Sequence, residues 1–411
     1  SIPDSMGLAI RTPLGTVVHT GDFKLDYTPV MGQATDLTRL AQLGSESVLL
    51  LLADSTYAEV PGYTPSERVV GEALDRIIAT APGRVIIATF ASLISRIQQV
   101  IDAAYLHGRR VFVAGRSMMD NVQMAMQQGY LLAPDGVLAP LEQLRDTPHQ
   151  ETVIVSTGSQ GEPTSALVRM ANGDHRQVRI LPGDTVILSS TPIPGNELLI
   201  SRTIDNLFRL GADVLHSRIA SVHVRGHAAQ EELKLVLSLV RPRFFVPVHG
   251  EYRHLVAHSR LAQMMGVPKD SVFALEDGDV LELDGGAASV VERVPASHVY
   301  VDGLAVGLDH VVLRDRHHLA TEGMVVVIMA VDKQTGRLVG RPDVVARGFV
   351  DMDRGEGVLE GTREVATKAL AGADHVSEWS DVNVKVKDAI AQFLYEKTRR
   401  RPMVLPVTLE V

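Results

Sequence analysis

Four polar side chains stand at or just beyond the ends of apolar runs that are typical of β-strands. They are Asp22 after 17–19, Asp54 after 48–53, His227 after 221–225 and His249 after 244–248. An open α/β sheet presents its ligands at strand ends, because the strand holds the side chain while the next loop opens onto a crevice. Imidazole and carboxylate suit zinc or manganese, and they also perform acid–base chemistry. Convergence of all four would favour such a site; each alone is more commonly a cap, a turn former or a half-buried imidazole.

Two loops rich in glycine and serine have the composition of an anion site. The loops 155–163 and 188–197 each follow a predicted strand and precede a helical pattern. Hydroxyls and backbone N–H groups at the start of a helix can bind a phosphate. An ordinary capped loop has the same composition, and neither loop is a Walker loop. Arg96, one turn into the helix predicted after 90–92, is a candidate for a single phosphate contact.

Basic residues cluster in two further segments, 312–319 and 397–402. A solvated face or an intersubunit ion pair is the usual explanation for such clusters. A path for a phosphate backbone is the more specific alternative. The net charge of −9 argues against unspecific coating with nucleic acid, so a nucleic-acid substrate would need a local basic groove.

The composition of the 411 residues is that of a globular protein with two or three domains, because 45% are hydrophobic and 22% charged. The longest apolar run, 324–331, is far too short to span a bilayer, and nothing at the start resembles a signal peptide. The chain contains no cysteine, so disulfides, thiolate zinc sites and a cysteine nucleophile are excluded. Any metal would be held by imidazole and carboxylate.

The order of the predicted elements indicates one domain inserted into another. Helical and strand patterns alternate from Ser66 to His216, which is the signature of a parallel sheet with crossover helices. The flanking segments 8–20 and 272–291 instead predict hairpins or short strands. A small third domain follows 295. It is predicted to hold strands at 324–330, 348–351 and 403–411 and helices at 362–371 and 380–398.

Nine segments together closely resemble bacterial ribonuclease J, in the order of that family and along essentially the whole chain. They are HTGDFK (19–24), LLADST (51–56), TGSQGEP (157–163), SSTPIPGNE (189–197), VRGHAAQEEL (224–233), PVHGEYRHL (247–255), VDGLAVG (301–307), LRDRHHL (313–319) and RRPMVLPVTLEV (400–411). The resemblance implies an α/β fold in which a partial metallo-β-lactamase αββα sandwich carries an inserted Rossmann-like β-CASP domain and a small C-terminal α+β domain. The implied boundaries are 1–62 and 218–294 for the metallo-β-lactamase domain, 63–217 for the β-CASP domain, 295–322 for a linker and 323–411 for the C-terminal domain.

The resemblance also implies roles for individual residues. Asp22 would bridge two metal ions, and His249 would complete the shell of the second ion. Asp54 would orient the site, and His227 would contact the scissile phosphate, so that these two are the expected catalytic residues. The residues expected near the nucleotide channel are Ser156, Thr157, Gly158, Ser159 and Arg96.

One family feature is absent: the His-x-His-x-Asp-His motif and the ligand histidine that precede the segment matching Ser1 to Asp4. Asp22 and His249 cannot hold two metal ions by themselves. We therefore expect an N-terminally truncated, inactive piece of a longer protein. The complete protein would be a cytoplasmic ribonuclease with two Zn²⁺ ions, or Mn²⁺ or Mg²⁺ in their place.

By resemblance, that ribonuclease would act both as a 5′-to-3′ exonuclease and as an endonuclease in RNA maturation, including rRNA processing, and in RNA decay. Its partners would be RNA, further copies in a homodimer or homotetramer, and other RNA-decay proteins, without a membrane. Two alternatives stay open: a non-catalytic RNA-binding or assembly subunit, and a small-molecule metallo-hydrolase.

Overall fold

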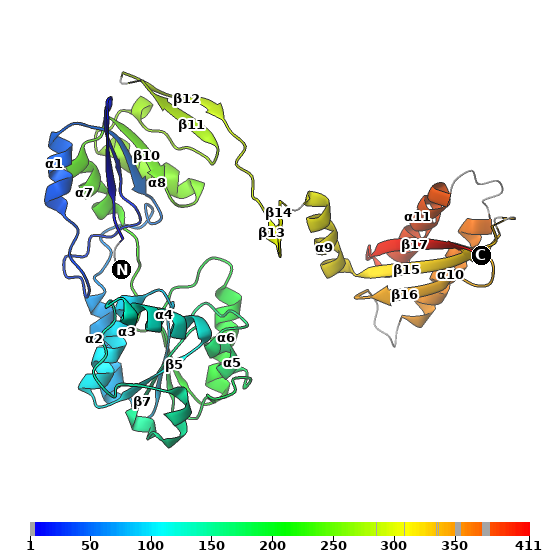
Figure 1. The fold of residues 1–411 in the computed structure, drawn as a ribbon, viewed down its shortest axis with the longest axis horizontal. Coiled ribbons are helices and arrows are strands. Elements are labelled where there is room, and N and C mark those ends of the chain that lie inside the picture. The colour runs from blue at the N-terminus through cyan, green and yellow to red at the C-terminus, as the bar shows by residue number, and fades with distance from the viewer. Residues whose placement is uncertain are drawn as a thin grey trace. The chain divides into compact units, whose positions relative to one another are not determined.

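The computed structural model describes residues 5–284, 286–307, 309–333, 335, 337–349, 355–371 and 379–411. The chain divides into two compact units, 1–295 and 296–411 (Figure 1). In the first unit, the segments that form a four-stranded sheet lie before and after the segment that forms a six-stranded sheet; we call the former the host part and the latter the insertion. Mixed α/β architecture with a parallel sheet, as predicted, is confirmed.

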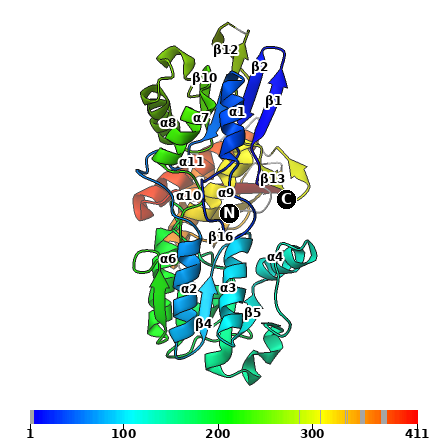
Figure 2. The same cartoon turned by 90° about the vertical axis from the view of Figure 1, so that its left-hand side faces the viewer.

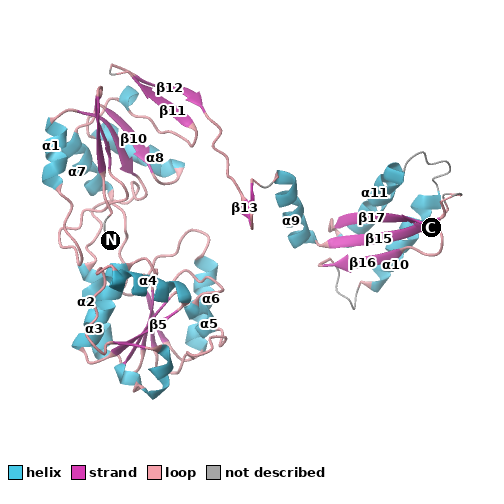
Figure 3. Ribbon diagram, in the orientation of Figure 1, coloured by secondary structure: helices cyan, strands magenta, loops and turns pink. Residues whose placement is uncertain are grey.

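The host part is built on a four-stranded sheet in the order β1-β2-β3-β10. Its strands are β1 (Leu8–Thr12), β2 (Gly15–His19), β3 (Val48–Asp54) and β10 (Phe244–Val248). The first two form the predicted hairpin, whereas β2, β3 and β10 run parallel. One face packs against the helices α1 (Leu37–Ser45), α7 (Gln230–Val240) and α8 (Tyr252–Met264) (Figure 3). A smaller apolar cluster on the other face includes residues of β11 (Asp279–Leu283), which pairs with β12 (Ala288–Arg293).

The insertion is a six-stranded sheet in the order β6-β5-β7-β4-β8-β9, with every pairing parallel. The strands are β4 (Val85–Ala88), β5 (Arg110–Ala114), β6 (Leu138–Ala139), β7 (Thr152–Ser156), β8 (Thr185–Leu188) and β9 (Asp213–His216). The helices are α2 (Arg68–Thr80), α3 (Ile94–Leu106), α4 (Arg116–Gln127), α5 (Ala166–Ala171) and α6 (Glu197–Arg209). Helices α2 and α3 lie side by side over the sheet (Figure 2).

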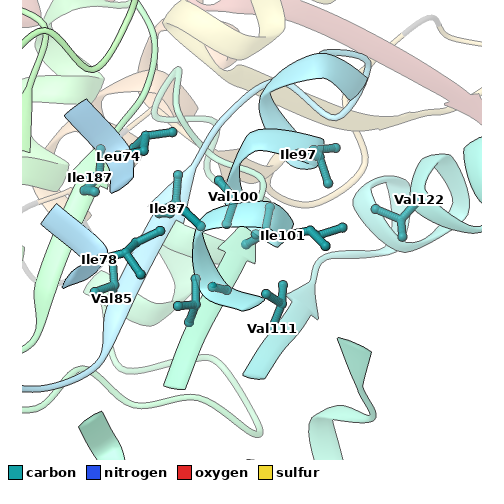
Figure 4. Close-up of a cluster of buried hydrophobic side chains, with 14 of the residues drawn as sticks. Leu74, Ile78, Val85, Ile87, Ile97, Val100, Ile101, Val111, Val122 and Ile187 are labelled. Carbon is teal, nitrogen blue, oxygen red and sulfur yellow. The ribbon is translucent and has the colours of Figure 1, made fainter. Parts of the chain in front are cut away.

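Alternating strand residues of the insertion pack on opposite faces of the sheet, because side chains alternate along a strand. Ile87 joins the cluster under α2, α3 and α4, which Figure 4 shows, whereas Ile86 joins the cluster under α5 and α6. Both faces are therefore covered by helices, and β4 is fully buried. This explains why its sequence is uninterrupted by polar residues.

The second unit contains a three-stranded sheet in the order β16-β15-β17. Its strands are β15 (Met324–Val331), β16 (Asp343–Arg347) and β17 (Met403–Glu410), and its core includes residues of the helices α10 (Glu356–Ala371) and α11 (Trp379–Thr398). The segment expected to be a linker, 295–322, holds the short strands β13 (Val301–Asp302) and β14 (Ala305–Val306) and the helix α9 (His310–Glu322). The side chain of Asp309 caps α9 by accepting a hydrogen bond from Val311 N.

Two predicted strands are wrong. The strand predicted at 348–351 lies earlier, at β16, where Val344 packs into the core; residues 350 and 351 lie outside the described residues. The segment 221–225 is not a strand, because its backbone does not pair with a sheet. Val222 N donates to Ala220 O, and the carbonyl oxygens of Val222 and Arg225 accept from the side chains of Arg96 and Lys24. None of the described helices combines the length and apolar character needed to cross a membrane.

Candidate metal centre and its surroundings

The carboxyl ends of three parallel strands bring three of the predicted site residues to one edge of the host sheet. Strand β10 pairs with β3 so that Val248 lies beside Asp54, and β2 pairs with β3 so that His19 lies beside Leu52. Asp22 follows β2 by three residues, and His249 directly follows β10. The parallel register therefore places these side chains together although they come from distant parts of the chain.

His227 completes the group from the loop before α7. One ligand atom each of Asp22, His227 and His249 lies within 4.8 Å of the others. Nδ1 of His249 is 3.7 Å from Oδ1 of Asp22. The imidazole rings of His227 and His249 are stacked, with their centroids 5.3 Å apart. The convergence on which the metal hypothesis depends is thus present in the structure.

The backbone turns sharply on either side of this cluster. His249 has a φ of +57°, which is uncommon for a residue other than glycine and is found where surrounding structure holds the chain in place. Gly21, before Asp22, has a φ of +62°, and a Cβ on it would come within 2.7 Å of the Met6 carbonyl oxygen. Glycine is therefore required to present Asp22 at this position.

Asp54 lies beneath the cluster and orients both imidazoles. Its carboxylate is only 1% exposed, and its two oxygens lie 2.7 Å from Nδ1 of His227 and 3.2 Å from Nδ1 of His249. Burial by itself would raise the pKa of Asp54, but hydrogen bonds from His227 and Thr56 outweigh burial and hold the pKa at about 2. Asp54 is therefore an ionised acceptor.

An ionised carboxylate only accepts hydrogen bonds, so Nδ1 of each histidine must carry the proton that faces Asp54. The lone pair of each ring then lies on Nε2, the tautomer that a histidine ligand or a proton-transfer group needs. Burial lowers the pKa of His227, but the hydrogen bond and charge of Asp54 dominate and raise the pKa overall. Thr56 supports this arrangement, because its hydroxyl lies 2.8 Å from Nδ1 of His249 and donates to Asp54.

The loop that carries His227 is fixed by contacts with three other segments. Thr64 donates its hydroxyl to the His227 carbonyl oxygen, and Ala228 N donates to Phe23 O. Behind them, the fully buried carboxylate of Glu232 accepts from the backbone N–H groups of Leu25, Thr64 and Ala229. Sequence reasoning missed Glu232, although its place as the third residue of α7 is a capping signal.

The donor set of the cluster fits a zinc ion. Two imidazoles and one carboxylate are the protein ligands of many catalytic zinc sites, which keep a fourth position for water or substrate. Asp22 and His249 are both exposed, so the site is open to solvent on one side. Among the described residues this is the group that can hold a metal, and three donors suffice for one ion, not for two.

Comparisons with known proteins show the family of this chain. Ribonuclease J2 of Bacillus subtilis (strain 168) is 44% identical over 100% of this chain and 74% of its own length. Ribonuclease J of Thermus thermophilus is 47% identical over 100% of this chain and 70% of its own length. The chain belongs to the ribonuclease J family.

Family models match three parts of this ribonuclease J chain. The ribonuclease J β-CASP domain matches 82–207, the Zn-dependent metallo-hydrolase RNA specificity domain matches 213–273, and the ribonuclease J C-terminal domain matches 311–411. The first lies in the insertion. The second includes His227 and His249, whereas Asp22, the third residue of the cluster, lies outside all three matched parts.

The first predicted anion loop, 155–163, lines a hollow of about 670 Å³ at the carboxyl ends of β4, β5 and β7, whereas no residue of the second loop, 188–197, is among its lining residues. Thr157 and Gly158 line it, together with the carboxylates of Asp120 and Glu162 and with three basic residues, Arg116, Arg169 and His175; burial lowers the pKa of His175. Sequence reasoning missed these three. The sequence signal for Arg116 is the glycine before it, Gly115, which directly follows β5. A glycine is needed there because a Cβ on Gly115 would lie 2.7 Å from the Thr157 hydroxyl.

Two serines of the first anion loop are buried. Ser156 is fully buried as the last residue of β7, and Ser159 is 2% exposed, with its carbonyl oxygen bonded to the Ser190 hydroxyl. The hydroxyl of Thr157 accepts from Ala166 N. As the structure stands, this loop mainly holds the insertion together, and Ser156 is too deeply buried to touch RNA.

The prediction that Arg96 contacts a phosphate is corrected. Arg96 is fully buried, and its guanidinium forms a bidentate pair with Glu67, with N–O distances of 2.6 and 2.9 Å. It also donates to the hydroxyl of Ser189 and to the carbonyl oxygen of Val222. Arg96 thus ties α3 to both chain segments that connect the insertion to the host part. Its position near the end of a strand was correct, but interior partners satisfy its charge.

A second hollow, of about 510 Å³, begins at Asp22 and extends to the insertion. Lys24, Glu67 and Tyr130 are among its lining residues. Lys24 is 7% exposed and donates to the carbonyl oxygens of Pro65 and Arg225; burial lowers its pKa more than nearby carboxylates raise it. This hollow joins the metal-binding cluster to the insertion.

Proposed function

We propose that this chain forms the catalytic and RNA-holding parts of a metal-dependent ribonuclease that cleaves phosphodiester bonds in RNA. The single observation that carries the proposal is the convergence of Asp22, His227 and His249 within 4.8 Å, in a member of the ribonuclease J family. A small-molecule hydrolase is less well supported, because the insertion adds a second hollow, lined by Arg116 and Arg169, that a compact substrate does not need.

Although Asp22, His227 and His249 can together hold one ion, we assign only Asp22 and His249 to the metal and leave His227 to the phosphate. Asp54 would keep His249 in the tautomer that binds the ion. When bound, a divalent cation polarises a phosphoryl oxygen and lowers the pKa of bound water. His227, with Nδ1–H fixed on Asp54, would present its other nitrogen to the scissile phosphate. There it would stabilise negative charge or protonate the leaving oxygen.

The two hollows would hold the rest of the RNA strand. The hollow beside Asp22 would take the nucleotide next to the cleaved bond. The hollow at the carboxyl ends of the insertion sheet, lined by Arg116 and Arg169, would take a phosphate. Thr157, Gly158 and Ser159 would contribute as lining residues, together with Arg116 and Arg169. Arg116 makes no ion pair with another described residue, so its charge is available to a phosphate.

The finer features of the proposal rest on the family. They are 5′-to-3′ exonucleolytic and endonucleolytic action in RNA maturation and decay, two zinc ions per site, homodimeric or homotetrameric assembly, and work in the cytoplasm with other RNA-decay proteins. Two ions would need about eight ligand positions, so water, substrate and protein donors beyond the three described ones would have to contribute.

The test is RNA cleavage and zinc content of the gene product that contains this chain, with His249→Ala as the variant. We expect the variant to lose cleavage and at least one equivalent of zinc. His149→Ala is the matched control, because His149 is an exposed histidine of the insertion. Full cleavage by His249→Ala would refute the proposed site. Zinc-free wild type that binds RNA without cleaving it would instead favour a non-catalytic RNA-binding subunit.

A further inference from the structure

The two basic segments of the second unit lie together in the structure. Nε2 of His318 on α9 contacts the carbonyl oxygen of Arg401, just before β17, although 83 positions separate them. Arg314, Lys387 and Arg401 line a hollow of about 580 Å³ next to this contact. We call it the Tyr395 hollow, after the ring that helps to line it.

The walls of the Tyr395 hollow combine these cations with an aromatic ring and apolar side chains. The guanidinium carbon of Arg401 lies 4.6 Å from the Tyr395 ring centroid, and that of Arg399 lies 5.5 Å from it. Pro402 and Val404 are buried beneath. Arg399 has a φ of +58°, so the chain turns through a left-handed residue between the end of α11 and Arg401. The Tyr395 ring, with two guanidinium groups over it, thus lies on an apolar floor.

The cations of this surface are not neutralised by the rest of the described chain. Lys387, Arg399 and Arg401 form no side-chain ion pair with another described residue, and Arg314 has only a distant contact, 3.7 Å, with its neighbour Asp315. All four are exposed. Since the whole chain carries a net charge of −9, this local cationic surface is what an anionic polymer would need in order to bind here.

We propose that the Tyr395 hollow binds single-stranded RNA outside the metal-binding site. Single strands are held by cations that follow the phosphates and by aromatic or guanidinium planes on which unpaired bases stack. The hollow offers both, whereas the bases of a duplex are already stacked on each other. An acidic peptide would use the cations but not the ring. The inference rests on the proposed function in that RNA is the substrate.

The test measures binding by the full chain without cleavage, in EDTA, with a fluorescent single-stranded RNA of about 20 nucleotides and its duplex as probes, a length that exceeds the site size of a typical single-strand binding module. Arg314→Glu/Lys387→Glu should weaken single-strand binding by roughly tenfold or more near 0.1 M salt and make the dependence of log K on log salt shallower by about two. Tyr395→Leu keeps the apolar wall but removes the stacking ring, and should weaken binding roughly fivefold or more with little change of slope.

Tyr395 should also be crosslinked by 4-thiouridine in the RNA.

Lys368→Glu on α10 is the control, because this exposed lysine lies outside the hollow and forms no ion pair with a described residue. Affinities of both test variants equal to that of the control would overturn the inference. So would equal displacement of the RNA by poly-glutamate, or dimeric wild type that becomes monomeric in the test variants. Failure of the proposed function would look different: wild type would bind RNA but would not cleave it when metal is supplied.

Discussion

Nδ1 of His227 lies 2.7 Å from Oδ2 of Asp54, although 173 positions separate the two residues. Asp54 in turn is 3.2 Å from Nδ1 of His249 through its other oxygen. One buried carboxylate therefore sets the tautomer and the direction of both imidazoles. Asp54 acts behind the exposed donors, which makes it a positioning residue rather than a ligand.

Asp54→Asn should reduce zinc affinity about 10- to 100-fold, which is the usual loss when a residue that holds a metal ligand in place is removed. The reason is that an amide has one acceptor oxygen, whereas the two imidazoles need two. Chelator competition measures it. Asp75→Asn is the matched control: Asp75 also accepts from a histidine, His107, at 2.8 Å, but on the surface of the insertion. Equal zinc affinity of the two variants would contradict the role of Asp54.

Arg96→Met should lower the free energy of unfolding of the first unit by about 3–5 kcal/mol, because it leaves Glu67 as an unpaired buried charge. The double variant Arg96→Met/Glu67→Leu should lose much less than the sum of the single changes. Arg11→Met, which breaks an exposed pair with Glu46, should cost less than about 1 kcal/mol. Urea unfolding measures the free energy of unfolding of Arg96→Met, Glu67→Leu, the double variant and Arg11→Met. If the losses of the two single variants add up to that of the double variant, Arg96 and Glu67 are not coupled.

Gly44→Ala should destabilise the first unit by about 1–3 kcal/mol, since a Cβ on Gly44 would lie 2.0 Å from the carbonyl oxygen of Leu239 where α1 meets α7. Gly357→Ala, in the exposed first turn of α10 with no atom within 4 Å of its Cβ, should instead stabilise the second unit by up to about 1 kcal/mol. Thermal unfolding distinguishes the two. A neutral Gly44→Ala would mean that α1 and α7 can separate without loss.

Stability should fall as the pH falls from about 6.5 towards 4. Burial lowers the pKa of His258 to about 3 and that of His223 to about 4, from an ordinary value of 6.5. In that window the unfolded chain binds protons that the folded chain does not, so each histidine lowers the free energy of unfolding by about 1.4 kcal/mol per pH unit. Urea unfolding at several pH values measures the slope. His258→Gln should make the slope shallower, and an unchanged slope would exclude His258 as a contributor.

Local sequence patterns predicted most of the elements. The apolar run before Asp54 is a strand, and the spacing of Val70, Leu74 and Ile78 gives a helix with one buried face, because periodicity is a property of neighbouring residues. The strand at 348–351 was misplaced, since the segment that pairs with β15 is chosen by packing across the sheet. The predictions for Asp22, Asp54 and His249 named the correct strand ends, whereas His227 lies in a loop and not after the strand predicted at 221–225.

The sequence by itself therefore determined the elements, the absence of thiolate chemistry and the residue types able to bind a metal. Only the tertiary structure decided which of them meet. The parallel register of β2, β3 and β10 brings Asp22 to His249. Packing around α3 of the insertion instead encloses Arg96 with Glu67 and removes it from any ligand. The reason is physical: hydrophobic periodicity acts over a few residues, but the solvation of a charge depends on groups hundreds of positions away.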